Sequence, residues 1–118
     1  MKVDIVTFTP SGSSVTAFLH DDTMTPKGAF IQVYKDGSNV NVGTGISNAT
    51  YNKGGAASMT TVKKTDYDSS NSIIAYDGTT LTLLGKVAST GFDTAGQITF
   101  SFTNYDSSYT VAVMVIGE

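Results

Sequence analysis

The sequence of 118 residues lacks arginine, cysteine and tryptophan, and it has few of the residues that build helices. Glu118 is its sole glutamate, and leucine occurs at four positions, 19, 81, 83 and 84. Helices draw on leucine, glutamate, arginine and glutamine, so this composition argues against long helices. Threonine, serine, valine, asparagine, aspartate and glycine dominate instead, which favours strands joined by turns.

The same shortages exclude several classes of function. Without arginine and at a net charge of -3, the chain has no basic surface to neutralise phosphates, so we expect no nucleic-acid partner. Without cysteine, disulfide frameworks, thiol catalysis and cysteine-ligated zinc are excluded. The longest apolar run, 111–116, is far shorter than a membrane span, and the first residues do not resemble a signal peptide. We therefore expect a protein made in a cytoplasm, with no membrane partner.

Alternation of apolar and polar residues predicts the strands. It is clearest at 2–9, 14–20 and 97–104, where β-branched and aromatic residues recur at every second position. Asp-Gly pairs predict two hairpin turns, one at 35–38 and one at 77–78. The first turn joins strands at 29–34 and 39–46, and the second joins strands at 72–76 and 79–88. Shorter strands are predicted at 59–65 and 90–92.

Two polar segments, 47–58 and 66–71, carry no strand pattern and are expected to be loops. Eight to ten short strands without helical periodicity then predict an all-β fold. The expected architecture is an antiparallel β-sandwich, jelly-roll-like, or a small barrel. At this length residues 1–118 form a single domain with one core.

The segment 109–116 is apolar on both faces, whereas an outer strand face normally meets solvent. This pattern places the strand centrally and predicts that a second subunit covers its other face. The alternative is that the loop at 47–58 folds over that face. We expect a homo-oligomer, a trimer being favoured. The interface candidates are Tyr51, Tyr109, Ala112, Met114 and Ile116.

Few residues suggest chemistry. His20 stands beside Asp21 and Asp22, but no Gly-x-Ser-x-Gly elbow accompanies them, and one histidine cannot build a zinc site. We therefore predict that the protein is not an enzyme and has no catalytic, metal or cofactor residues. Asn48-Ala49-Thr50 matches a glycosylation pattern, which without a secretion signal carries little meaning.

The acidic stretch 66–77 has the oxygen spacing of a calcium loop in part. Its sixth position is Asn71 where such loops need glycine, and its twelfth is Asp77 where they use glutamate. A solvated turn is therefore the expected reading. Several of the six tyrosines stand in or beside predicted loops, where they could stack on sugars or contact other proteins. The alternative is that they pack in the core or on edge strands. The six are at positions 34, 51, 67, 76, 105 and 109.

Three segments of the chain carry a resemblance to a known family. They are Thr25-Pro26-Lys27-Gly28-Ala29-Phe30-Ile31-Gln32-Val33, Thr90-Gly91-Phe92, and the ending from Gln97-Ile98-Thr99-Phe100-Ser101-Phe102 through 109–117. Together they resemble small β-sandwich modules of tailed bacteriophage virions, which occur in capsid decoration proteins and in tail or fibre proteins.

The resemblance implies a structural function without catalytic residues. The expected protein is a virion component, foremost a decoration or cement protein on the capsid exterior, whose partners are the major capsid protein or other virion proteins. A tail, fibre or baseplate module is one alternative. A carbohydrate-binding, lectin-like module is another, based on the tyrosine-bearing loops and hydroxyl-rich faces.

Overall fold

A computed structural model of the chain describes residues 1–35, 41–48, 50–58, 66–68, 70–76 and 80–118. These residues form ten strands and no helix. In chain order the strands are β1 (Lys2–Phe8), β2 (Ser14–Phe18), β3 (Pro26–Lys35), β4 (Asn41–Asn48), β5 (Asn52–Ser58), β6 (Asp66–Asp68), β7 (Ile73–Tyr76), β8 (Leu81–Val87), β9 (Gln97–Phe102) and β10 (Tyr109–Gly117). The predicted all-β fold is confirmed.

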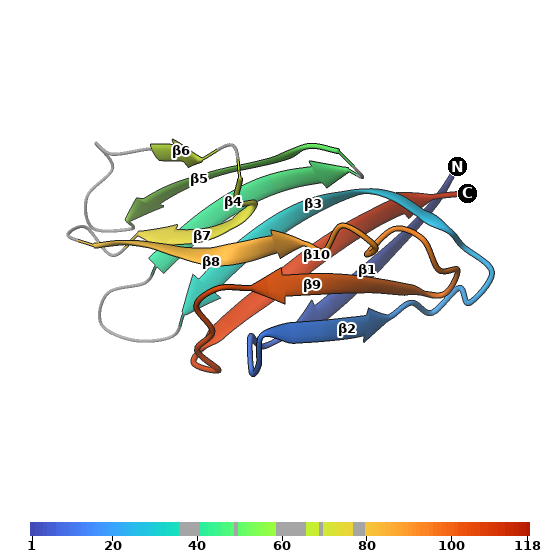
Figure 1. Cartoon of the computed structure of the whole chain (residues 1–118), viewed down its shortest axis with the longest axis horizontal. Helices are drawn as coiled ribbons and strands as arrows, with labels where there is room; N and C mark the ends of the chain where they lie inside the picture. The colour runs from blue at the N-terminus through green and yellow to red at the C-terminus, as the bar shows by residue number, and fades with distance from the viewer. Residues whose placement is uncertain (36–40, 49, 59–65, 69, 77–79) are drawn as a thin grey trace.

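The strands form two antiparallel sheets that pack together as a β-sandwich (Figure 1). One sheet has the order β1-β10-β3-β4-β5-β6, and the other has the order β7-β8-β9-β2. The two meet where Val42 of β4 pairs with Tyr76 of β7. Both termini lie at the same end of the molecule, since Lys2 pairs with Gly117.

The core lies between the sheets and is built by the inward positions of each alternating strand. Val111, Val113 and Val115 of β10 are fully buried and face β9, whose Ile98 and Phe100 are also fully buried. Phe8 of β1 packs on Phe100 with ring centroids 4.6 Å apart. Burial of large apolar side chains is the dominant favourable contribution to folding, so these positions specify the sandwich.

The clearest alternation gives the most accurate predictions. β1, β9 and β10 lie within a residue or two of the predicted ranges, and β10 is a central strand between β1 and β3 as expected. The two predicted hairpins are present as antiparallel pairs, β3 with β4 and β7 with β8. Their turn residues at 36–40 and 77–79, and the predicted strand at 59–65, lie outside the described residues.

The predicted loop at 47–58 is wrong, because residues 52–58 form β5 beside β4. This strand lacks the usual signature since Gly54 and Gly55 stand at its centre. A Cβ on Gly54 would lie 3.0 Å from the carbonyl oxygen of Asn71, so glycine lets the segment before β7 approach β5 closely. Strand β5 therefore depends on its pairing with β4 rather than on intrinsic strand propensity.

Two smaller predictions also fail. Residues 66–68, expected in a loop, form β6, which pairs with β5. Residues 90–92, expected as a strand, form turns in which the N–H of Gly91 donates to the carbonyl of Ala88 at 2.8 Å. The apolar signal there arises because Phe92 is buried in the core without joining a sheet.

Candidate functional site

The most distinctive surface is the side of the first sheet that faces away from the core, here called the outer face. Strand registers place four large apolar residues in one row across β1, β10, β3 and β4: Ile5 pairs with Met114, Met114 with Phe30, and Phe30 with Ile46. Directly paired residues point to the same side of an antiparallel sheet, so these side chains form a continuous ridge.

The ridge is open to solvent. Ile5 is 63% exposed, Phe30 49%, Ile46 44% and Met114 40%. Val3 of β1, Tyr34 of β3 and Tyr51 before β5 add further exposed apolar surface. Contiguous exposed apolar surface of this kind is uncommon on monomeric proteins and marks interaction sites.

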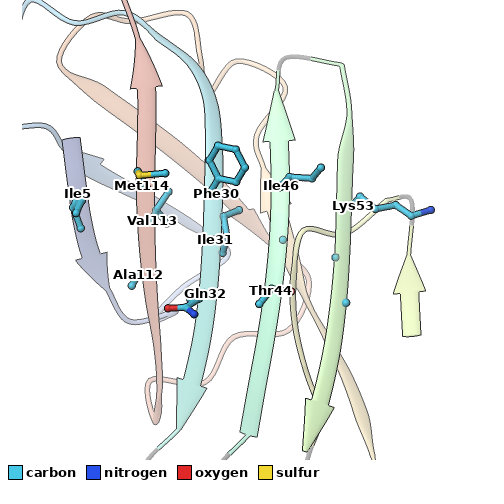
Figure 2. A pocket seen from close by; sticks show the side chains of 13 residues that line it. Ile5, Phe30, Ile31, Gln32, Thr44, Ile46, Lys53, Ala112, Val113 and Met114 are labelled. Carbon is cyan, nitrogen blue, oxygen red and sulfur yellow. The ribbon is translucent and has the colours of Figure 1, made fainter. Parts of the chain in front are cut away.

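Beside the ridge lies a hollow of about 550 Å³. Its other wall is the adjacent row of register partners, Ala112, Gln32, Thr44 and Gly55, which carries smaller side chains. Figure 2 shows this row at one level of the strands and the ridge at the next. The outer face is therefore a ridge of large apolar residues next to a depression of similar length.

A second hollow of about 350 Å³ extends the outer face toward the end of β4. Tyr51 and Ile116 line it together with Phe30 and Ile46. Tyr51 stands in the turn between β4 and β5, where the N–H of Asn48 donates to its carbonyl at 2.8 Å. Register thus brings four of the five interface candidates, Tyr51, Ala112, Met114 and Ile116, onto one surface.

The fifth candidate, Tyr109, lies elsewhere. It is only 6% exposed and belongs to the core, beneath Lys35, whose Nζ lies 5.0 Å from the centre of its ring. Tyr109 stands two residues before Val111 in an alternating strand, so the two residues share the inward face. Placing Tyr109 among the interface residues is therefore corrected.

The alternative cover for the outer face, the segment 47–58, is wrong. The segment 47–58 was the candidate for folding over β10 within one chain, but β5 lengthens the sheet instead. The ridge residues accordingly keep two-fifths or more of their surface exposed.

The outward side of the other sheet differs sharply in composition. Small polar residues predominate on β2 and β9, where Thr16 pairs with Thr99 and Ser14 with Ser101, and Lys86 of β8 stands beside Ser101. The hydroxyls of Thr16 and Thr99 lie 3.0 Å apart and hydrogen bond to each other. Phe18, at the end of β2, is the exception on this side at 73% exposed. The apolar outer face is thus specific to one sheet.

Sequence reasoning did not single out Phe30 and Ile46, although they complete the ridge. The outward position of Phe30 follows from alternation with the buried Ala29 and Ile31, and that of Ile46 from alternation with the buried Gly45 and Ser47. Their alignment with Met114 follows from strand register. Val3 and Ile5 carried a usable signal, since both lie opposite the inward Val6 on β1.

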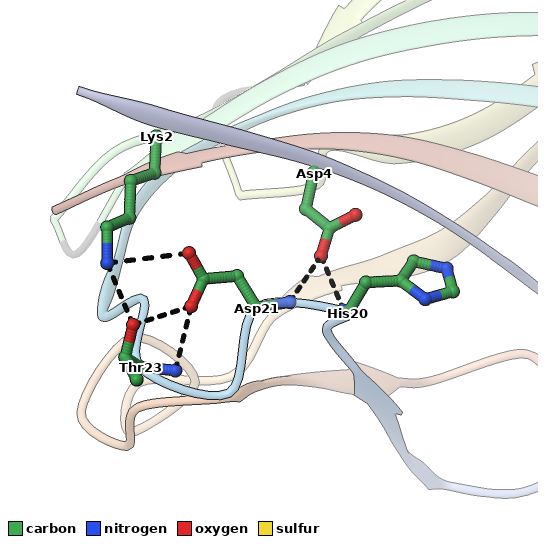
Figure 3. A network of polar contacts seen from close by, with 5 residues as sticks. All are labelled: Lys2, Asp4, His20, Asp21 and Thr23. Atoms are coloured by element: carbon green, nitrogen blue, oxygen red, sulfur yellow. Dashed lines mark hydrogen bonds and ion pairs between the residues drawn. The ribbon is translucent and has the colours of Figure 1, made fainter.

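His20 enters a network of polar contacts through its backbone. Its backbone N–H, not its ring, donates to Oδ2 of Asp4, and the N–H of Asp21 donates to the same oxygen at 3.2 Å (Figure 3). Asp21 in turn accepts from the hydroxyl and N–H of Thr23 and lies 3.4 Å from the ammonium of Lys2. These contacts tie the start of β1 to the segment that follows β2.

The carboxyl pKa values in this network reflect those contacts. Partial burial raises the pKa of Asp4, but backbone N–H donors from Asp21, Ile5 and His20 outweigh it and lower the pKa below the ordinary value. The hydroxyl and N–H of Thr23, followed by Lys2, lower the pKa of Asp21. Both carboxylates are ionised at neutral pH and serve the structure.

The described residues contain no group of three or more potential metal ligands. Of the partial calcium pattern, Asp66 and Asp68 stand in β6 and Asp77 is not among the described residues. Asn48 of the glycosylation pattern accepts the N–H of Thr50 at 3.0 Å through its side chain. No helix in the described part of the chain has the length and apolarity to cross a membrane.

No family model, curated protein or solved structure matches the chain.

Proposed function

We propose that the protein is a structural component of a bacteriophage virion, a decoration protein on the capsid exterior, and that it acts through symmetric contacts of its outer face. One observation carries the proposal: a ridge of half-exposed Ile5, Met114 and Phe30 on one sheet, while the other sheet presents Thr and Ser. Exposed apolar surface is expected where a partner covers it.

Two further considerations support a structural function. Small β domains assemble into symmetric oligomers whose contacts are repeated around the symmetry axes. The segments 25–33, 90–92 and 97–117 resemble virion modules, and they supply β3, β9 and β10, two of which carry the outer face. Of the three carboxyl groups whose pKa values shift, Asp4 lies on β1 on the side opposite Ile5, and Asp21 and Asp106 lie in turns.

The test is to purify the virions of the phage that encodes this chain and to identify their proteins by mass spectrometry and electron microscopy. We expect the chain in fixed proportion to the major capsid protein and on the outer shell. Density in the tail would favour a fibre or baseplate module instead. Absence from purified virions would overturn the proposal, and binding on a glycan array would then favour a lectin-like module.

A further inference from the structure

We propose that two copies of this chain pack face to face through the outer face, about a two-fold axis that runs across the strands between the ridge and the hollow. The inference deepens the proposed function by naming the first partner of the same surface, a second copy.

Shape is the first argument. A rotation of 180° about that axis turns the two faces toward each other and places each ridge over the hollow of the other copy. Met114 then lies over the second copy's Ala112, and Phe30 lies over its Gln32. On each strand the ridge residue and the residue of the neighbouring row are two positions apart, which is about 7 Å along the strand. An axis midway between the two rows therefore passes close to both.

Sheet packing agrees with this arrangement. Aligned sheets pack about 10 Å apart with strands crossing at roughly 30°, and their side chains interdigitate. Contact is therefore closest at the centre of the face, on β10 and β3, where Met114 and Phe30 stand. The face sets large apolar residues in one row beside Ala112, Thr44 and Gly55 in the next, with Gln32 as the one long and flexible side chain of that row. Large residues beside small ones are what interdigitation with a copy of itself requires.

Area is the second argument. Seven apolar side chains on the outer face are 40% to 63% exposed: Val3, Ile5, Phe30, Tyr34, Ile46, Tyr51 and Met114. A large aromatic side chain buries about 150 to 250 Å² when it is fully covered, and aliphatic side chains bury somewhat less. Seven such side chains at about half exposure therefore present on the order of 600 Å² of accessible surface per copy. Two copies would bury roughly 1,200 Å², the lower end of stable, specific interfaces.

Charge is the third argument. Lys53 is the charged residue that lines the larger hollow, and it stands on β5 at the margin. No acidic side chain is among the residues lining either hollow. Lys27, at the start of β3, lines the smaller hollow. Since both lysines stand at the margin, the centre of the face meets its own copy without like-charge repulsion, whereas a charged partner would find no complement there. The polar Gln32 and Thr44 are direct register partners, close enough to bond to each other once covered.

Sedimentation velocity of the purified full chain, at concentrations up to about 1 mM, tests the inference because this range detects weak association. We expect a monomer–dimer equilibrium. Met114→Asp should raise the dimer dissociation constant at least about 100-fold, because it places a carboxylate in the covered apolar contact. Thr99→Asp is the matched control, since Thr99 faces outward from a central strand of the other sheet, and it should leave the dimer unchanged.

A complementation experiment tests the two-fold geometry itself. Ala112→Lys alone should also raise the dissociation constant about 100-fold, because it fills the hollow with a charge. Mixing the Ala112→Lys and Met114→Asp proteins should restore a heterodimer to within about tenfold of wild type, because the proposed axis sets the new carboxylate of one copy against the new ammonium of the other. Native mass spectrometry identifies the mixed species by mass, and circular dichroism verifies that each variant is folded. If the aspartate variant fails to fold, Met114→Glu replaces it in both experiments, because glutamate keeps the carboxylate that the mixing experiment needs.

Several results would overturn the inference. They are a monomer at every concentration, a trimer, a dimer that Met114→Asp leaves intact, or a mixture that does not restore association. None of them bears on whether the chain is present in virions, so the two proposals fail separately. Conversely, a two-fold dimer with the expected complementation would stand even if the chain were absent from virions.

Discussion

Gly45 is one of the positions at which the fold should be most sensitive to a single methyl group. It lies on β4 and faces the inside of the sandwich, where a Cβ would stand 1.8 Å from the carbonyl oxygen of Ser72 and 2.7 Å from its carbonyl carbon. Ordinary contacts of this kind begin near 3.4 Å. The backbone before β7 therefore has to move by about 1.5 Å in Gly45→Ala, since neither atom belongs to a flexible side chain.

The displacement is costly because of what β7 carries. Ile73, Ile74 and Ala75 are fully buried, and Ser72 Oγ donates to Oδ1 of Asn52 at 3.3 Å. Overpacking of this kind typically costs about 1 to 3 kcal/mol, and a rigid backbone obstacle places Gly45→Ala near the upper value. For a domain of this size 3 kcal/mol corresponds to a fall in Tm of about 10 to 15 °C.

Gly28→Ala is the matched control. Gly28 lies on the neighbouring strand β3, and a Cβ there would stand 3.5 Å from the carbonyl oxygen of Ser47, an ordinary contact. Its substitution should leave stability within about 1 kcal/mol of wild type or raise it slightly, because alanine restricts the unfolded chain. Urea unfolding and calorimetry at pH 7 measure both variants. A Gly45→Ala protein as stable as Gly28→Ala would refute the close packing of β7 on β4.

Two further predictions concern the charged residues. Asp4→Asn should destabilise the protein at pH 7, and this effect should shrink as the pH falls below about 3.8. Hydrogen bonds depress the folded pKa of Asp4, so its contribution to stability is present above the unfolded pKa near 3.8 and is lost as pH falls through the folded value. Asp106→Asn is the control. Asp106 accepts hydrogen bonds from Ser108 through Oδ1 alone, an oxygen that asparagine retains, whereas Asp4 accepts through both carboxylate oxygens. Equal effects of the two variants on Tm would contradict this account. EDTA should leave Tm unchanged, because the partial pattern at 66–77 lacks the residues of a calcium loop. A fall of more than about 5 °C, about 1 kcal/mol, would reveal a metal site.

Sequence alone predicts the strands whose alternation is set by large residues. On β9 the inward Ile98, Phe100 and Phe102 alternate with polar residues, and the structure buries all three. The prediction fails where tertiary contacts replace side-chain pattern. On β5 two glycines interrupt the alternation, and the strand forms because it pairs with β4 through backbone hydrogen bonds. Glycine at position 54 leaves room for Asn71 and Ile74, which pack closely against it.

The outer face could be predicted in part for a related reason. Apolar residues on both sides of β10 indicate that something covers Met114 and Ile116, and this follows from the sequence alone. Which neighbours stand beside Met114 depends on the registers of β1 and β3, which connect residues more than 80 positions apart. Alternation along one strand identifies which side a residue faces, but it cannot align that residue with Ile5 or Phe30.

The comparison of the two outer sides supports the proposal that the apolar one is an interaction surface. Hydroxyl residues such as Thr16, Thr99 and Ser101 suit a solvated strand face, and they occupy most of the outward positions of β9 and β2, with Phe18 as the apolar exception. The same chain nevertheless presents Ile5, Phe30 and Ile46 from three strands of the other sheet, aligned in one row. Scattered exposed apolar residues need no explanation, but a register-aligned ridge beside a hollow does. Since the core needs only the inward positions of these strands, the outward apolar row is best explained by contact with another molecule.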